Sequence, residues 1–77
     1  MAEAFWDKEV EIATYSKNNR GEEIKIKKVK KGNKTYVDVR TFYMQDGVQK
    51  PGKGVSIPDD LADEIAQSII ESGKVEI

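Results

Sequence analysis

The spacing of apolar residues changes once along this chain, at Pro58. Before that proline, apolar and polar residues alternate in runs that are separated by turn residues, which is typical of β-strands. After it, apolar residues recur every third or fourth position, which is typical of an amphipathic helix. The helical positions are Leu61, Ala62, Ile65, Ala66, Ile69 and Ile70. The pattern predicts an α+β fold with four antiparallel strands followed by one C-terminal helix (ββββα).

Turn residues separate the predicted strands. Residues 17–21 contain Asn and Gly, which supply the positive φ angles that a chain reversal needs, and Gly32-Asn33 closes a second turn. Residues 44–53 contain Asp46-Gly47 and Pro51-Gly52 and are predicted to form a flexible loop. The four strands are predicted over residues 9–15, 22–30, 34–43 and 54–57.

Val29 is out of phase within the second predicted strand. Ile24 and Ile26 share one face, and simple alternation places Val29 on the other. One extra residue near positions 27–28 would return Val29 to the face of the isoleucines, so a β-bulge is predicted there.

The 77 residues are predicted to form a single domain over residues 1–77, with a C-terminal tail at residues 73–77. Residues 1–8 form either a loose arm or a short strand that packs an aromatic side chain onto the body. Trp6 is interpreted as a packing residue, because Lys8 is the only basic residue near it in the sequence. A chain of this length buries only about 60% of its unfolded surface, which favours stabilisation by a second copy.

The chain contains neither cysteine nor histidine. Their absence excludes disulfides, catalytic triads and zinc sites with the usual ligands, so we expect no enzyme activity, no bound metal and no cofactor. The sequence shows no apolar run of about 20 residues and no signal-peptide pattern. We therefore expect no membrane partner, and a cytoplasmic, nucleoid-associated location in a bacterium or virus or a nuclear one in a eukaryote.

Eleven of the thirteen basic residues lie between Lys17 and Lys53, among only four acidic residues. This segment carries a net charge of +7 and the rest of the chain −8, although the total is only −1. Such separation favours a polyanionic partner. The alternative is that the lysines protect an exposed sheet edge from aggregation. Against it, the lysines extend through both turns and are interleaved with Tyr36, Phe42 and Tyr43, a combination suited to single-stranded nucleic acid.

Two segments resemble a known family. Residues 38–43 (DVRTFY) and 50–57 (KPGKGVSI) are similar to the transcriptional coactivator family called positive cofactor four. That family shows an Asp-hydrophobic-Arg strand followed by aromatic residues, a loop ending in Lys-Gly-hydrophobic-Ser-hydrophobic, and a closing helix. The similar order of elements covers about residues 9–72. A compact chain of this kind is more similar to the bacterial or viral members.

The resemblance implies a homodimer with curved sheets that bind single-stranded DNA with little sequence preference. It further implies roles in transcription regulation, replication or repair, with that machinery as a partner. The helices would pair through Leu61, Ile65 and Ile69, and the acidic remainder of the chain would lie at the back and at the dimer interface. The residues expected to bind DNA are Arg20, Lys25, Lys27, Lys28, Lys30, Lys34, Arg40, Phe42, Tyr43, Lys50 and Lys53.

Several alternatives stay open at this point. Many family members have a tryptophan after the arginine, and either Phe42 or Tyr43 could take its role, although strand alternation places Phe42 on the side of Arg40. Arg40 could instead serve only to pair with Asp38. The whole protein could bind RNA, or could act as an adaptor that recruits a protein through its acidic helix.

If about five phosphates are neutralised, the salt dependence of single-strand binding should have a log–log slope of about −3 to −4.

Overall fold

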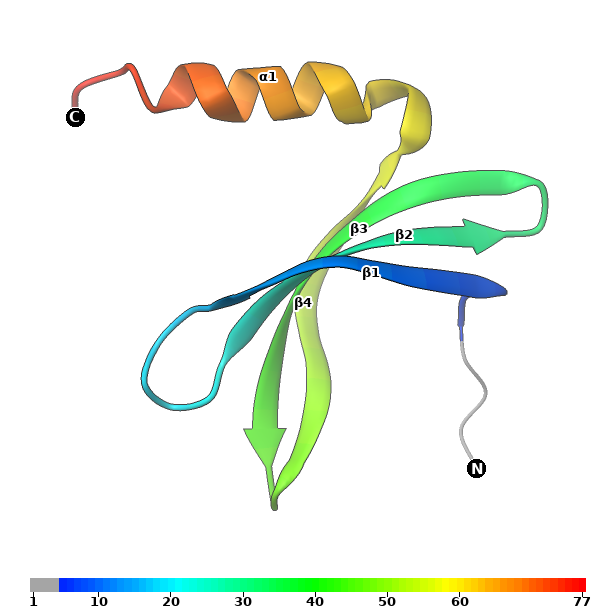
Figure 1. The fold of residues 1–77 in the computed structure, drawn as a ribbon, viewed down its shortest axis with the longest axis vertical. Helices are drawn as coiled ribbons and strands as arrows, with labels where there is room; N and C mark the ends of the chain where they lie inside the picture. The colour runs from blue at the N-terminus through cyan, green and yellow to red at the C-terminus, as the bar shows by residue number, and fades with distance from the viewer. Residues whose placement is uncertain (1–4) are drawn as a thin grey trace.

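The computed structural model describes residues 5–77 (Figure 1). The elements are β1 (Lys8–Ser16), β2 (Glu23–Lys31), β3 (Lys34–Gln45), β4 (Val48–Pro58), the short 3-10 helix η1 (Asp59–Leu61) and the helix α1 (Ala62–Ser72). The strands form one antiparallel sheet in the order β1-β2-β3-β4. The predicted fold, a curved four-stranded antiparallel sheet followed by a C-terminal helix, is confirmed.

The first two reversals lie where the turn residues predict them. In the turn between β1 and β2, the side-chain oxygen of Asn18 accepts a hydrogen bond from the backbone N–H of Arg20 at 2.9 Å. Gly21 follows with φ at 84°. Between β2 and β3, Gly32 adopts a φ of 61° in a two-residue turn. These are backbone conformations that glycine enters at little steric cost.

The prediction of a flexible loop over residues 44–53 was wrong, as was the short strand from residue 54. Asp46 and Gly47 both have positive φ angles, 54° and 77°, and close a tight hairpin of the kind that Asp-Gly favours. β4 begins directly after this turn. Pro51 is tolerated because β4 is at the edge of the sheet. An edge strand can turn the nitrogen of a proline toward solvent, so no acceptor in the sheet loses a hydrogen bond.

Gly54 explains why this segment resembles a loop in the sequence and yet forms a strand. The register of β3 and β4 shifts where Thr41 lies opposite two residues of β4. A Cβ atom on Gly54 would approach the carbonyl oxygen of Val39 to 2.6 Å. Glycine at this position therefore allows the two strands to approach closely at a bulge, where glycine is common in β-strands.

The bulge predicted in the second strand was also wrong. β2 pairs with β3 without interruption, and the irregularity lies in β1, between Glu11 and Ala13. Val29 therefore stays on the face of Lys25 and Lys27, where only 1% of it is exposed. No bulge is needed to bury Val29, because the face on which it lies has its own small apolar cluster around Tyr36.

Pairing across the sheet sorts the side chains into two faces. One, the groove face, carries Glu9, Glu11, Lys25, Lys27, Val29, Tyr36, Asp38, Arg40, Phe42 and Ser56. The other, the aliphatic face, carries Val10, Tyr15, Ile24, Ile26, Val37, Val39, Tyr43, Val55 and Ile57. Charged and aromatic groups thus gather on one side and aliphatic groups on the other.

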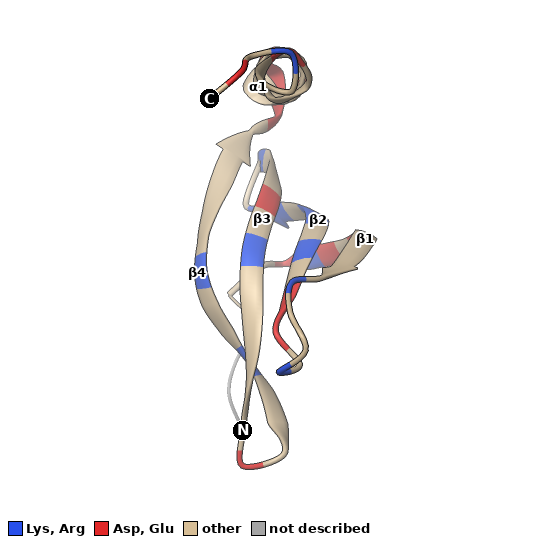
Figure 2. Ribbon diagram, turned by 90° about the vertical axis from the view of Figure 1, so that its left-hand side faces the viewer, with Lys and Arg blue, Asp and Glu red and all other residues tan. Residues whose placement is uncertain are grey.

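The helix α1 lies beyond one end of the sheet (Figures 1 and 2) and buries none of its side chains. Asp63 and Glu64 occupy its first turn, where acids suit the helix dipole. The chain is extended as a result. Its radius of gyration is 14.2 Å, whereas a compact chain of this length has about 11–12 Å. Val29 and Ile57 are the only buried hydrophobic side chains among residues 5–77.

Candidate functional site

A groove of about 730 Å³ runs across the groove face. Residues of all four strands line it, together with residues that precede β1. Its lining is Phe5, Trp6, Glu9, Lys27, Asp38, Arg40, Phe42, Pro51, Gly52 and Ser56. The groove therefore combines cations, carboxylates and aromatic rings.

Arg40 is fixed in this groove by three hydrogen bonds. Its Nε and Nη2 atoms donate to the two carboxylate oxygens of Asp38 at 3.2 and 3.1 Å, and Nη1 donates to the carbonyl oxygen of Gly52 at 3.0 Å. Asp38 is buried, with 3% exposed, and also accepts from the hydroxyl of Ser56 at 2.9 Å. A guanidinium has five N–H donors, so two remain for a ligand. Asp38 therefore positions Arg40 and leaves two of its N–H groups available to a ligand.

Phe42 lies on the side of Arg40, as the strand alternation predicts, with two ammonium groups over its ring. The Nζ atoms of Lys25 and Lys27 lie 5.2 and 5.1 Å from the ring centroid. Distances of this order give an attractive cation–π interaction. Phe42 thus holds both lysines close to an aromatic face.

Acidic residues of β1 lie next to these lysines. Glu9 pairs with Lys27 at 3.6 Å, and Glu11 pairs with Lys25 at 3.5 Å. The expectation that the acidic remainder lies at the back was therefore wrong for β1, because antiparallel pairing places these glutamates beside β2. The hydroxyl of Thr14, which donates to Glu11 at 2.8 Å, and then the charge of Lys25 lower the pKa of Glu11. The groove is consequently close to neutral when empty.

The structure does not bring all the predicted DNA-binding residues together. Four of them, Lys28, Lys30, Tyr43 and Lys50, lie on the aliphatic face. Lys28 contacts the carboxylate of Asp59 in η1. The basic segment is therefore divided between the two sides of the sheet, and its basic positions along the strands are blue in Figure 2.

Three other predicted residues lie in a turn, at the start of a strand or in the bulge. Lys34 follows the turn between β2 and β3, and Lys53 lies in the irregular part of β4, where its carbonyl accepts from Thr41. Arg20 lies in the turn between β1 and β2, 3.6 Å from the carboxylate of Glu22. None of these side chains lines the groove.

Two aromatic groove residues, Trp6 and Phe5, were not among the predicted binding residues; Trp6 was interpreted as a packing residue, and it does lie against Tyr36. The Trp6 ring lies edge-on to Phe5 at 4.7 Å between centroids and 5.7 Å from the ring of Tyr36. No signal near Trp6 in the sequence could have shown this. Its position depends on the register that brings the start of β1 to the end of β2 and hence to β3.

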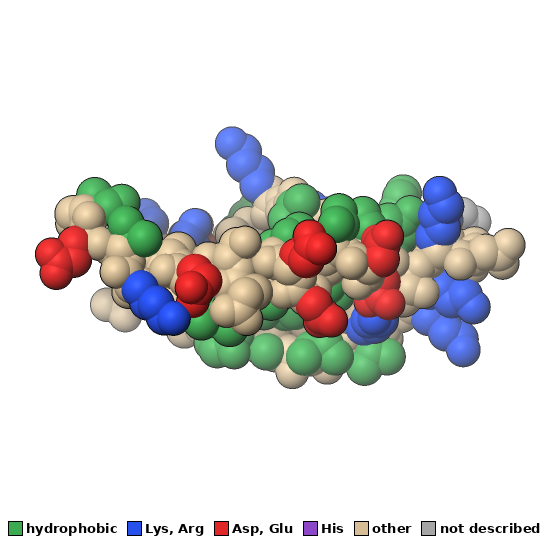
Figure 3. Space-filling view, turned by 90° about the horizontal axis from the view of Figure 1, so that it is seen from above, with side chains coloured by type: hydrophobic (Ala, Val, Ile, Leu, Met, Phe, Trp, Pro, Cys, Tyr) green, Lys and Arg blue, Asp and Glu red, His purple; other side chains and the backbone are tan. Residues whose placement is uncertain are grey.

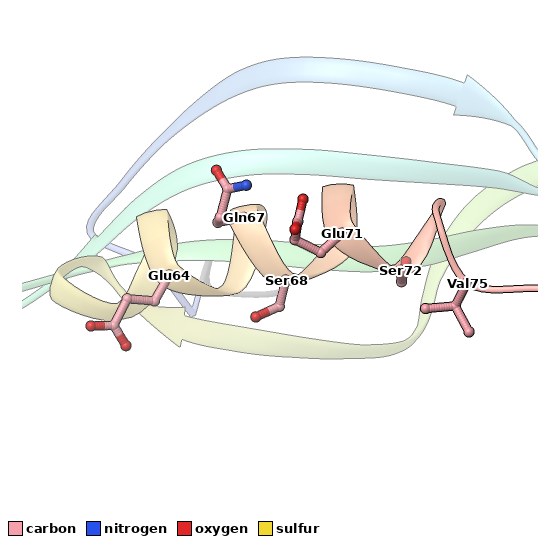
Figure 4. Close-up of a pocket in the computed structure, with 6 residues that line it drawn as sticks. All are labelled: Glu64, Gln67, Ser68, Glu71, Ser72 and Val75. Atoms are coloured by element: carbon pink, nitrogen blue, oxygen red, sulfur yellow. The ribbon is translucent and has the colours of Figure 1, made fainter.

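The helix offers a different surface. Acidic side chains gather over it, with hydrophobic ones beside them (Figure 3). A shallow hollow of about 520 Å³ is lined by Glu64, Gln67, Ser68, Glu71, Ser72 and Val75 (Figure 4). Its two carboxylates would repel phosphate. Within residues 5–77 no cluster of acidic side chains could hold a metal ion, and no helix is long and apolar enough to cross a membrane.

Comparisons with known proteins agree with this architecture. Residues 16–68 match the family described as Transcriptional Coactivator p15 (PC4). The crystal structure of a PC4 homolog from Burkholderia pseudomallei has a TM-score of 0.78 and 25% sequence identity, covering 95% of this chain and 100% of that chain. A search of curated proteins found no match. The predicted resemblance is confirmed, and the chain belongs to the Transcriptional Coactivator p15 (PC4) family.

Proposed function

We propose that the protein binds single-stranded DNA with little sequence preference, as a non-catalytic homodimer that serves transcription, replication or repair. Membership of the family implies nucleic-acid binding. The observation that carries the proposal is the groove in which Lys27, Arg40 and Phe42 lie together. Cations that follow a phosphate backbone and rings that stack on bases are what a single-strand site requires.

Phosphates would bind to Lys25, Lys27 and the two unused N–H groups of Arg40. The lysines must then exchange their glutamate partners for phosphate. Their ammonium groups reach partly exposed carboxylates at 3.5 and 3.6 Å. Such surface ion pairs contribute only about 0–1 kcal/mol, so the exchange costs little. A base stacked on Phe42 adds about 1–3 kcal/mol whatever its identity, which accounts for the weak sequence preference.

The surface area of the protomer supports the homodimer. The chain exposes 6356 Å², whereas a compact monomer of its mass exposes about 4700 Å². The excess, about 1600 Å², is the area that each copy contributes to many obligate homodimers. Leu61, Ile69 and Ile70 are 43%, 65% and 60% exposed. A second copy would cover them, since an aliphatic helix surface seldom stays open to water.

The proposal is tested by titrating labelled oligothymidine and a duplex of the same length at two salt concentrations. We expect the single strand to bind more tightly. If three phosphates are neutralised in the groove, the log–log salt slope is about −2, less steep than the slope expected from the charge of the whole segment. Equal affinity for the duplex, or binding that does not respond to salt, would contradict the proposal. A matched RNA oligomer that binds more tightly would retain the single-strand site but assign it to RNA.

A second candidate function is protein recruitment through α1. The observation that favours it is the exposed aliphatic side of the helix, including Ile69 and Ile70. In a homodimer that side is covered. Recruitment through it therefore requires a protein that remains monomeric, and light scattering on the free chain separates the two functions.

A further inference from the structure

The segment before β1 is held against the hairpin of β2 and β3, and it contributes to the lining of the groove. The backbone N–H of Asp7 donates to the carbonyl of Lys30 at 2.8 Å, and its carboxylate accepts from the N–H of Gly32 at 2.8 Å. The ammonium of Lys31 donates to the carbonyl of Phe5 at 2.8 Å and lies 5.0 Å from the centroid of that ring. These contacts hold residues 5–7 against the hairpin of β2 and β3.

Trp6 is held with one side against Tyr36 and another open to the groove. Its ring is tilted by 46° to that of Tyr36 at 5.7 Å, and it lines the same groove as Phe42. The residue is half-buried. A tryptophan that served only to fill a core would have no reason to reach a groove that also contains Lys27 and Arg40.

Trp6 and Phe42 line the groove beside different parts of β3. Tyr36, which contacts Trp6, precedes Phe42 by six residues on β3, a span of about 20 Å at about 3.3 Å per residue. Successive nucleotides of a stacked strand are about 3.4 Å apart. The two aromatic side chains would therefore contact different bases of one strand.

We propose that Trp6 is a second base-stacking site in the groove, in addition to Phe42. The inference rests on the proposed single-strand binding. Indole offers the largest aromatic face of any side chain, and stacking of a base on it needs no particular sequence. Lys31, beside Phe5, and Lys27 supply cations for the phosphates on either side of the stacked base.

The test uses the fact that Trp6 is the only tryptophan in the chain. Unlabelled oligothymidine is titrated into the full chain while tryptophan emission is recorded, and labelled oligothymidine gives the Kd by anisotropy. We expect emission to be quenched with the same midpoint as the anisotropy. Bound oligomer should also protect the indole from acrylamide. Trp6→Ala should weaken binding between about fivefold and 100-fold, and Trp6→Phe should restore most of the affinity.

Tyr15→Ala is the matched control. Tyr15 is an aromatic residue of β1 that is 58% exposed and lies on the aliphatic face, so its loss should leave oligothymidine affinity within about twofold. Circular dichroism establishes that each variant is folded. If Trp6→Ala does not fold, the quenching and acrylamide protection of the natural protein still decide the question.

The possible failures are distinguishable. Binding by anisotropy with unchanged tryptophan emission, or with unchanged affinity in folded Trp6→Ala, would overturn the role of Trp6 and leave the proposed function intact. Absence of any oligothymidine binding would overturn the proposed function itself.

Discussion

The two faces of the sheet differ in whether their side chains have partners within the chain. On the groove face three cations already have a carboxylate partner within the chain: Lys25 and Lys27 pair with glutamates, and Arg40 pairs with Asp38. On the aliphatic face many side chains have no cover, and Val10 and Val55 are 59% and 54% exposed.

The difference indicates two kinds of partner. Exposed aliphatic groups gain free energy when any apolar surface removes them from water, and a second copy of the chain offers such a surface. Paired surface charges gain little from each other and can be transferred to phosphate at small cost. We therefore propose that the aliphatic face serves assembly and that the groove face serves ligand binding.

The largest expected effect comes from placing charges on the apolar side of α1. Ile65→Asp with Ile69→Asp should abolish dimerisation, because each buried isoleucine contributes about 1.5–3 kcal/mol and a chain of this size has few other sources of stability. Light scattering should show the natural protein at twice the 8.7 kDa of one chain and the variant at or below one chain mass, or unfolded. Gln67→Asp with Ser68→Asp, on the polar side, is the control and should remain dimeric.

The next effect concerns the buried carboxylate of the groove. Asp38→Ala removes the acceptor of both Arg40 and Ser56 and should lower the free energy of unfolding by about 3 kcal/mol, the lower end for a broken buried pair because Arg40 stays partly exposed. Urea denaturation measures this loss. Asp38→Asn, which keeps one acceptor oxygen, should lose less. A variant as stable as the natural protein would show that Asp38 does not position Arg40.

The choice between Phe42 and Tyr43 follows from the faces on which they lie. Phe42→Ala should weaken oligothymidine binding by about 1–3 kcal/mol, which is about 5- to 140-fold. Tyr43→Ala, on the aliphatic face, should affect stability or dimerisation but change affinity for DNA by less than about threefold. Anisotropy titrations of the two variants measure the difference. The reverse result would place the DNA on the aliphatic face.

The smallest effect is a gain. Glu9→Gln with Glu11→Gln frees Lys27 and Lys25 and should tighten binding by at most about fivefold, because exposed ion pairs are weak. The lowered pKa of Glu11 adds a test of pH. Its carboxylate stays charged until the pH falls through that lowered pKa, and there its stabilising pair with Lys25 is lost and the lysine becomes free for phosphate. The affinity of the natural protein for oligothymidine should rise in that range, and the rise should be absent in the variant.

The fold could be predicted from the sequence where local patterns determine it. The change of period at Pro58 and the residues of the first two turns predicted the order of elements and two hairpins. The hairpin of β3 and β4 could not be predicted from Pro and Gly content, because an edge strand tolerates Pro51 and a bulge needs a residue without Cβ near Gly54. The bulge predicted from Val29 was wrong for a related reason. Alternation alone does not show that each face of a sheet can have buried apolar side chains.

The candidate site was predicted only in part. Alternation placed Phe42 beside Arg40, and the pairing of Arg40 with Asp38, raised from the sequence only as an alternative to DNA binding, is present in the structure. Charge counts could not divide the lysines between two faces, because that division depends on the register. The alternating glutamates of β1 and lysines of β2, on either side of one turn, were a usable signal that the two sets meet.

The most direct test of the account uses two variants of β2 with the same change in charge. Lys25→Glu with Lys27→Glu alters the groove face, and Lys28→Glu with Lys30→Glu alters the aliphatic face of the same strand. Anisotropy with labelled oligothymidine at one low salt concentration measures the Kd of both. We predict a loss of more than tenfold for the first variant and less than about threefold for the second. Equal losses, or a greater loss for Lys28 and Lys30, would contradict a DNA site on the groove face.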